Sequence, residues 1–319
     1  MSGPSFHKSL VDAWFMSGLS NNDKPSSIRG VKGNEVVLKN FAYALSSGFG
    51  KYEIDFNSWS TKIQDSIDIS SISITIISKF NDNWMCWANI KIPDFKVEIK
   101  GLPNNNNNNF SYRYAKNNTP LKQYINADGV YNLPASEINY NSGFYVDDPS
   151  IDFTGLTITQ LPSAYEGGLV FDGVDDYGIC TGLPILDDYT VICRREIINK
   201  DYYSVASKST VFGKGAFIFE LIQGRTNHCY SFAADNQINL YNSEISWQTK
   251  NSYNGSTITV GNGEDTDTLT LGIIRVGDES RRFLQGAIYY FALYNKSLTP
   301  EEIETEKERL NEEWLKRKN

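Results

Sequence analysis

The chain has 319 residues, 40% of them hydrophobic, and a formal net charge of −8 at pH 7. This length allows one large or two medium-sized domains, each with a buried core. The acidic balance argues against nucleic acid as a partner, because such affinity comes from Lys and Arg side chains that displace counterions from phosphates. The 19 Tyr, 17 Phe and 24 Gly residues favour strands and turns.

The sequence shows no signal for export or for a membrane span. It does not begin with a basic segment followed by a long apolar stretch, and it contains no run of about 18 apolar residues. We therefore expect a protein made in a cytoplasm, with no membrane partner.

The four cysteines are scattered, and none lies in a Cys-x-x-Cys motif; they are Cys86, Cys180, Cys193 and Cys229. The chain has only two histidines, so residues that commonly bind zinc are few. We predict free thiols buried among strands, with a disulfide or a zinc site as the alternative.

Short apolar runs alternate with loops over residues 8–56. The runs include residues 10–11, 14–15, 36–38 and 52–56, and polar loops lie between them at residues 20–25 and 30–34. This pattern is typical of the first strands of a β-sandwich.

Residues 58–159 contain a second set of strand patterns. Apolar and polar residues alternate at 70–78, 84–90, 95–100 and 110–114, and proline and glycine separate these segments. We predict a small, separate β-sandwich inserted into the first one.

Six consecutive asparagines occupy residues 104–109. Because such a short polar run has nothing apolar to bury, we predict a solvated hairpin loop. A sugar-binding tip is the alternative, since asparagine amides pair well with hydroxyl groups.

The most specific local pattern lies at residues 167–180. A short apolar run ends at Phe171, Asp172-Gly173 follows, and apolar alternation resumes before Cys180. Gly173 can adopt the positive φ of a primed hairpin turn, and Asp172 can hydrogen-bond to its own backbone. We predict a β-hairpin here.

The chain ends in a predicted helix. Thr299 is a good N-cap, Pro300 suits the first helical position, and Glu302 completes a capping box. The apolar residues that fall on one face of this helix are Ile303, Leu310 and Trp314. This narrow stripe indicates docking on the sandwich or on a neighbouring subunit.

Several of these segments resemble one family. The motif Leu-Val-Phe-Asp-Gly-Val-Asp-Asp-Tyr at 169–177 resembles the first core hairpin of laminin-G-like, concanavalin A-like jelly rolls. Residues 286–295 and 297–303 are similar to the closing strand and helix start of that family, and residues 11–41 are similar to its opening.

The order of three sequence motifs points to a narrower group of proteins. Asp-Gly-Val-Tyr-Asn-Leu-Pro at 128–134, Thr-Ile-Thr-Gln-Leu-Pro at 157–162 and then the motif at 169–177 resemble proteins encoded by crAss-like phages and Bacteroidales prophages. The resemblance implies an all-β fold. A laminin-G-like jelly-roll sandwich would comprise residues 1–57 and 160–319, with the C-terminal helix, and a smaller β-sandwich of residues 58–159 would be inserted in it.

A catalytic constellation is not evident. Glycoside hydrolysis needs two carboxylates about 5 to 9 Å apart across the sugar. Glu53-Ile-Asp55 is the nearest match to the Glu-x-Asp-x-x-Glu pattern of jelly-roll glucanases, but Ser58 stands where the third acid would fall. His228 is followed by Cys229 on a predicted strand, where neighbouring side chains point to opposite faces. We predict that the protein is not an enzyme.

Calcium is the one ion that the resemblance implies, because laminin-G-like domains often hold it at the rim of the sandwich. The candidate ligands are Asp172, Asp175 and Asp176, and a second acidic loop lies at residues 264–267. Neither loop has EF-hand spacing, so acids that form turns without a metal are the alternative. No other cofactor is predicted.

Glycan binding would use exposed aromatic rings beside amide groups. In the polar stretch 239–255, the candidate residues are Tyr241, Trp247, Tyr253 and Asn254. The alternative is that Trp247 packs in the core or at a subunit interface.

These observations and the resemblance together predict a non-catalytic virion structural protein of a phage, a capsid-surface fibre or tail-associated component assembled in the host cytoplasm. We expect it to form a homo-oligomer, to contact other virion proteins and to touch host or mucosal glycans. The alternative function is that of a bacterial carbohydrate-binding module or a degenerate glycoside hydrolase, which would normally carry a signal peptide.

Overall fold

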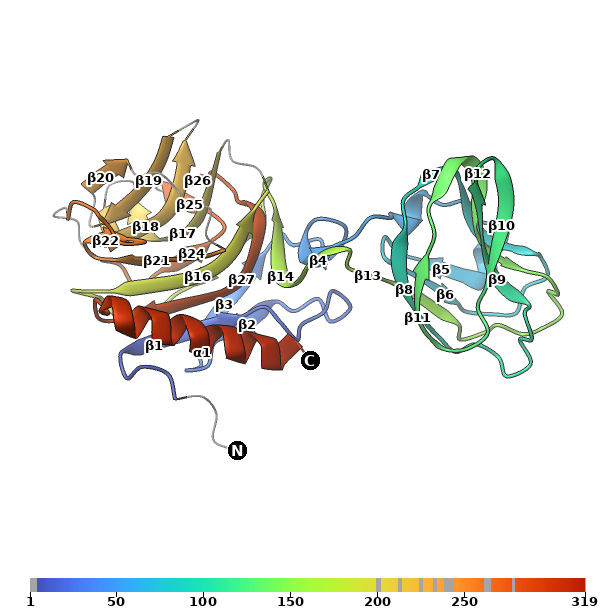
Figure 1. The fold of residues 1–319 in the computed structure, drawn as a ribbon, viewed down its shortest axis with the longest axis horizontal. Coiled ribbons are helices and arrows are strands. Elements are labelled where there is room, and N and C mark those ends of the chain that lie inside the picture. The colour runs from blue at the N-terminus through green and yellow to red at the C-terminus, as the bar shows by residue number, and fades with distance from the viewer. Residues whose placement is uncertain are drawn as a thin grey trace. The chain divides into compact units, whose positions relative to one another are not determined.

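The computed structural model describes residues 5–198, 202–211, 214–223, 226–231, 234–237, 244–260, 265–276 and 279–318. The chain divides into two compact units (Figure 1), of which unit 1 comprises Met1–Gly50 with Tyr165–Asn319 and unit 2 comprises Lys51–Ala164. Nearly all regular elements among the described residues are antiparallel strands, and the only α-helix there lies at the C-terminal end. The prediction of an all-β fold with a C-terminal helix is confirmed.

Unit 1 is a β-sandwich. Its first sheet runs in the order β23 (Ser256–Thr257), β22 (Ser252–Tyr253), β21 (Ile245–Thr249), β16 (Thr190–Ile197), β27 (Gln285–Tyr294), β14 (Ala164–Asp172) and β4 (Gly48–Lys51), and β1 (Leu10–Phe15) also pairs with β27. Its second sheet runs in the order β2 (Ser27–Arg29), β3 (Glu35–Lys39), β15 (Tyr177–Cys180), β24 (Leu269–Leu271), β17 (Tyr202–Val211), β18 (Lys214–Gln223), β19 (Thr226–Ser231) and β20 (Ala234–Gln237). A separate two-stranded ribbon consists of β25 (Ile274–Val276) and β26 (Glu279–Arg281).

The core of unit 1 lies between these two sheets. Trp14 and Phe291 of the first sheet and Val36 of the second are buried together in one cluster. Because β27 is buried on both faces, its sequence Gln-Gly-Ala-Ile-Tyr-Tyr-Phe-Ala-Leu-Tyr is almost wholly apolar or aromatic. The three described cysteine side chains, Cys86, Cys180 and Cys193, are buried thiols that form no disulfide with one another, as predicted. The side chain of Cys229 falls outside the described residues.

The predicted hairpin at residues 167–180 is wrong in its pairing. Gly173 has a φ of 82°, and the Oδ1 atom of Asp172 accepts a hydrogen bond from the backbone N of Val174 (2.8 Å), so the predicted turn exists. However, β14 belongs to the first sheet and β15 pairs with β3 and β24 in the second. The turn therefore carries the chain from one sheet to the other, which lets both strands bury apolar side chains in the shared core.

The outer face of the first sheet is covered by α1 (Pro300–Lys318), as Figure 1 shows. The capping box is present, since the backbone N of Glu302 donates to Thr299 Oγ1 (3.2 Å) and the backbone N of Thr299 donates to Glu302 Oε2 (2.8 Å). The predicted stripe of Ile303, Leu310 and Trp314 is buried against β1, β16 and β27. Docking on the sandwich, one of the two predicted alternatives, is confirmed.

Unit 2 is a smaller sandwich of two sheets. One sheet has the order β10 (Thr119–Tyr124), β9 (Phe110–Lys116), β12 (Ser136–Val146) and β7 (Trp84–Ile92). The other has the order β11 (Gly129–Leu133), β8 (Phe95–Lys100), β13 (Thr157–Leu161), β6 (Ser73–Ile76) and β5 (Ile67–Ile69). Two 3₁₀ turns, η1 (Phe56–Ser58) and η2 (Gln64–Ser66), precede these strands.

The core of unit 2 also takes in residues that the sequence assigned to the larger sandwich. Ile54 and Phe56 are buried in the same cluster as Phe95 and Phe144. The segment 51–57 thus packs with unit 2 rather than with the predicted sandwich of residues 1–57. A pattern of apolar residues cannot show this, because it does not say which core a short segment joins.

The asparagine run at 104–109 is not simply a solvated loop, so that prediction is wrong. Asn106 is 2% exposed, its Nδ2 donates to the Ile125 carbonyl (2.6 Å), and its Oδ1 accepts from the backbone N of Phe110 (2.9 Å). Asn109 is buried as well. Amide side chains can be buried here because they satisfy backbone groups that a turn leaves without partners.

Candidate functional site

Those of the predicted glycan-binding residues of unit 1 that the structure describes do not form an exposed aromatic site. Tyr253 has no exposed surface, so its ring cannot stack on a sugar, and that prediction is wrong. Trp247 is half-buried and packs against the cluster under α1, as the alternative interpretation expected. The side-chain amide of Asn254 forms a hydrogen bond within the protein, in which Oδ1 accepts from the backbone N of Trp247 (2.8 Å). Tyr241 lies outside the described residues.

The predicted calcium ligands do come together. Side-chain oxygens of Asp172, Asp175 and Asp176 lie within 4.8 Å of one another. The oxygens of Asp176 accept hydrogen bonds from Ser47 Oγ (3.0 Å) and from the backbone N of Asp172 (3.0 Å), which shows that the cluster also builds the turn. Burial is the main cause that raises the pKa of Asp176 to about 7; the two hydrogen bonds oppose this rise, and the charges of Asp172 and Asp175 add to it. Calcium binding at this cluster stays a prediction.

The second acidic loop, at residues 264–267, is described from Asp265 onward. Asp265 Oδ2 accepts a hydrogen bond from the backbone N of Leu186 (2.7 Å), so this carboxylate holds a neighbouring loop in place.

The acid pair of residues 53 and 55 has structural partners. Asp55 caps η1 by accepting from the backbone N of Asn57 (3.0 Å), and Glu53 Oε1 accepts from Ser163 Oγ (2.8 Å). That the protein is not an enzyme stays a prediction.

A group of side chains that the sequence analysis did not single out lies on the outer face of the β10-β9-β12-β7 sheet of unit 2. On β9 and β12, Tyr112 and Phe144 point into the core. Their chain neighbours Arg113 and Tyr145 therefore point to the opposite face of the sheet, because successive side chains of a strand alternate. We call the group the aromatic face and define it by Trp84, Trp87, Arg113, Lys122 and Tyr145.

The strand register brings these residues into adjacent rows. Arg113 on β9 lies opposite Lys122 on β10 and opposite Gly143 on β12, and Gly143 in turn lies opposite Trp87 on β7. In the next row, Tyr145 lies opposite Trp84. The aromatic face thus spans all four strands of the sheet.

The three aromatic rings of this face form a continuous cluster. The ring centroids of Trp84 and Trp87 are 5.6 Å apart, and those of Trp84 and Tyr145 are 5.1 Å apart at a nearly perpendicular angle of 78°. All three side chains are half-buried, so each ring keeps part of its surface in contact with solvent. Edge-to-face packing of this kind holds the rings in fixed orientations.

Two cations lie over these rings. The guanidinium carbon of Arg113 is 3.1 Å from the centroid of Tyr145 and 5.2 Å from that of Trp84. The Nζ atom of Lys122 is 5.1 Å from the centroid of Tyr145. All three distances are within the range of cation–π attraction, which fixes long, flexible side chains on the sheet surface.

The carboxylate of Asp147 interacts with both cations. Asp147 Oδ1 accepts a hydrogen bond from Lys122 Nζ at 2.5 Å and lies 3.8 Å from the Nη2 atom of Arg113. The three charged groups therefore sum to one positive charge on an otherwise acidic chain.

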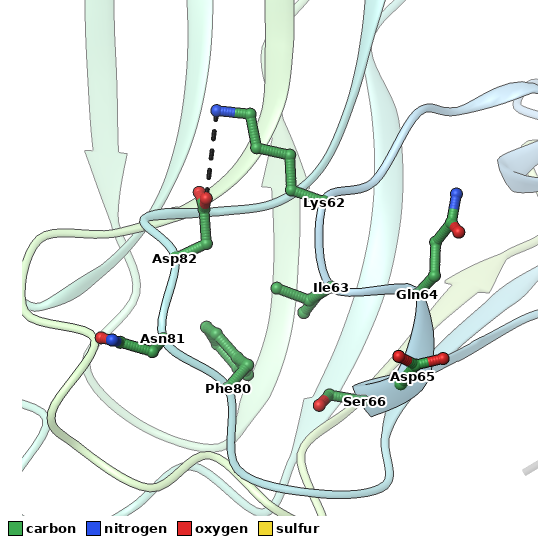
Figure 2. Close-up of a pocket in the computed structure, with 8 residues that line it drawn as sticks. All are labelled: Lys62, Ile63, Gln64, Asp65, Ser66, Phe80, Asn81 and Asp82. Atoms are coloured by element: carbon green, nitrogen blue, oxygen red, sulfur yellow. Dashed lines mark ion pairs between the residues drawn. The ribbon is translucent and has the colours of Figure 1, made fainter.

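A small pocket lies next to the start of β7 (Figure 2). Its volume is about 260 Å³, and it is lined by residues 62–66 and 80–82. Of these residues, Ile63 and Phe80 are buried, and Asp82 Oδ2 lies 3.9 Å from Lys62 Nζ. Asp82 Oδ1 also accepts from the backbone N of Trp84 (2.9 Å), so this pocket residue positions the first aromatic residue of the face.

No helix among the described residues is both long enough and apolar enough to cross a membrane.

Comparison with known proteins gives little further guidance. No protein-family model and no curated protein matches the chain. Among solved structures, it is similar to botulinum neurotoxin type C, described for its interaction with two ganglioside molecules, with a TM-score of 0.35 and 13% identity over 64% of this chain and 52% of that one. The binding domain of botulinum neurotoxin DC in complex with SialylT gives a TM-score of 0.34, 13% identity and the same coverages. The chain spans about half the length of these neurotoxin chains.

Proposed function

We propose that this protein binds carbohydrate without catalysis and that the aromatic face of unit 2 is its binding surface. The observation that carries the proposal is the pair of half-buried indoles, Trp84 and Trp87, which lie next to each other on the outer face of a sheet. The C–H faces of a sugar ring pack well on flat aromatic rings, and nearby polar groups can bind its hydroxyls.

A core role alone does not account for this arrangement. The core of unit 2 is on the opposite side of the sheet, where Tyr112, Phe144 and other aromatic residues fill it. The indoles of the aromatic face instead present apolar surface to solvent beside charged groups. Binding sites commonly combine such apolar surface with a few fixed polar groups.

The proposal is tested on a glycan array with the whole protein and two single variants, Trp84→Ala and Trp87→Ala. We expect bound glycans to lose at least about tenfold in affinity in either variant, because loss of one stacking ring removes about 1.4 kcal/mol or more. Trp247→Ala, which removes a half-buried indole from unit 1, is the matched control and should leave binding unchanged. Thermal unfolding of each variant verifies that unit 2 is still folded.

Two results would reject the site. If Trp247→Ala abolishes binding and the two variants of unit 2 do not, the glycan site is in unit 1. If the unmodified protein binds no glycan on a broad array, carbohydrate binding itself is rejected.

We further propose that the protein is a homo-oligomeric structural component of a phage virion, in contact with other virion proteins. Support comes from the resemblance of the sequence to phage-encoded proteins, and it concerns biological context rather than chemistry. Light scattering of the purified protein, with and without calcium, measures its native mass. A stable dimer or trimer is expected, whereas a monomer would favour the alternative of a bacterial carbohydrate-binding module.

A further inference from the structure

We propose that the aromatic face selects an anionic saccharide, one that carries a carboxylate or sulfate group, and that Arg113 binds this group. The inference rests on the proposed carbohydrate function and names the class of sugar that the same surface takes. Three observations carry it: the free hydrogen-bonding capacity of Arg113, the local excess of positive charge, and the position of the guanidinium beside the indoles.

The side chain of Arg113 is mostly buried and yet donates no hydrogen bond to any described residue. Its side chain is 20% exposed, and its Nε atom is buried without a partner. A guanidinium group has five N–H donors, and a buried donor without an acceptor destabilises the fold. Native proteins rarely leave such groups unsatisfied. The Nη groups of the partly exposed fork also donate to no described residue, so they can donate to an acceptor that a ligand supplies.

The charge around Arg113 favours an anion. The nearest carboxylate, Asp147, lies 3.8 Å from Arg113, beyond hydrogen-bond distance, and is engaged by Lys122 at 2.5 Å. One carboxylate thus faces two cations. The remaining ion pair near Trp84, between Lys62 and Asp82, is neutral as a pair. An anionic ligand group would complete the charge balance and would accept hydrogen bonds from a preformed fork.

The position of the guanidinium is also suitable. It lies on the ring of Tyr145 and 5.2 Å from the ring centroid of Trp84. A sugar that stacks on the indoles would therefore bring a charged substituent close to Arg113. The opposite strand position is Gly143, which has no side chain that would compete for the guanidinium.

The test compares matched probes on the whole protein by calorimetry. The carboxylated probe is a short oligogalacturonate, with its carboxyl-reduced form as control. The sulfated probe is a kappa-carrageenan oligosaccharide, which carries no carboxylate, with its desulfated form as control. We expect at least one charged probe to bind about ten- to a hundredfold more tightly than its neutral form. The two pairs show which anion is preferred.

Variants connect this preference to the residue. Arg113→Gln should lower affinity for the charged probe to that of its neutral form, and Arg113→Lys should retain only part of the preference because it lacks the planar fork. Asp147→Asn, which releases both cations, should tighten binding of the charged probe. Arg29→Gln removes one positive charge from unit 1 and is the control for net charge.

The outcomes separate this inference from the proposed function. Equal binding of charged and neutral probes, lost in Trp84→Ala, would overturn the anion preference and keep carbohydrate binding. A preference that persists in Arg113→Gln would overturn the role of Arg113. If no saccharide binds, both proposals fail.

Discussion

Asp176 is a carboxylic acid that the fold has made hard to ionise. It has no exposed surface, and burial raises its pKa from an ordinary value of 3.8 to about 7. Because the pKa is higher in the folded than in the unfolded chain, the folded state holds more protons between these values. The contribution of Asp176 to stability is therefore present in full below about pH 4 and is lost as the pH rises toward 7.

This linkage predicts the behaviour of Asp176→Asn. The amide stays neutral, so the variant should gain stability relative to the unmodified protein as the pH is raised from 4 to 8. Urea unfolding at both pH values measures the difference in free energy. Asp187→Asn, at an exposed acid of unit 1 that does not act on Asp176, is the control; a difference for Asp176→Asn that does not change with pH would contradict the pKa shift.

Gly143 controls how closely β12 approaches β7 at the centre of the aromatic face. A Cβ atom at this position would lie 2.2 Å from the Cys86 carbonyl oxygen and 2.6 Å from the Cα atom of Trp87. Backbone atoms cannot move aside as a side chain can, so the two strands would have to separate.

We predict that Gly143→Ala destabilises unit 2 by about 1–3 kcal/mol, the usual cost of overpacking. It should also weaken glycan binding, because Trp87 would be displaced. Thermal unfolding and the array measure the two effects. Asn141→Ala, at an exposed position of the same strand, should change neither, and a stable Gly143→Ala protein would show that the strands can separate at little cost.

At the scale of elements, α1 is held by more than its apolar stripe. Glu306 is 1% exposed, and its carboxylate accepts hydrogen bonds from the backbone N of His7 (3.1 Å) and from Tyr294 Oη (3.0 Å). Arg309 forms an ion pair with it at 2.6 Å. Burial, followed by the charge of Glu306, raises the pKa of Tyr294, so this phenol remains a donor across the physiological range.

Trp314 anchors the last turns of the helix. Its side chain donates from Nε1 to the Gly167 carbonyl (2.9 Å), and its ring packs against Tyr289 and Arg194. We predict that Trp314→Ala lowers the stability of unit 1 by about 3–5 kcal/mol. The next residue, Leu315, is 45% exposed, so Leu315→Ala should cost little. Chemical unfolding compares the two, and an equally small effect of both variants would mean that Trp314 does not anchor the helix.

Some features of these elements could be predicted from the sequence. The helix, its capping box and its stripe depend on spacing along the chain, so they were predictable from Thr299, Glu302 and Leu310. The turn at Gly173 was predictable as well, for the same reason. The partners of β14 and β15 were not, because a turn of this kind suits a hairpin and a crossing between sheets equally well.

The aromatic face was missed for a comparable reason. A strand with period-two alternation places Trp84 and Trp87 on opposite faces, since they are three residues apart. In the structure, Cys86 pairs with Phe144 but Trp84 pairs with Tyr145, so Met85 is an extra residue at a bulge. The bulge returns both indoles to one face, and only the register with β12 reveals it.

At the scale of the whole molecule, unit 2 has the features of an independent domain. It has a core of its own, formed by residues from both of its sheets. Its two ends lie side by side, because the backbone N of Ser163 donates to the Lys51 carbonyl (2.7 Å). Chain ends that meet in this way are typical of an inserted domain.

We therefore predict that residues 51–164 fold when expressed alone. The fragment should give a dispersed amide NMR spectrum, unfold cooperatively, and bind the saccharide probes with the affinity of the whole chain, because every residue of the aromatic face lies within it. Calorimetry of the whole chain should show one transition near that of the fragment and another that Trp314→Ala shifts downward. If the fragment is unfolded and the whole chain unfolds in a single transition, the two cores form one cooperative unit. The stability of the aromatic face in unit 2 would then depend on unit 1.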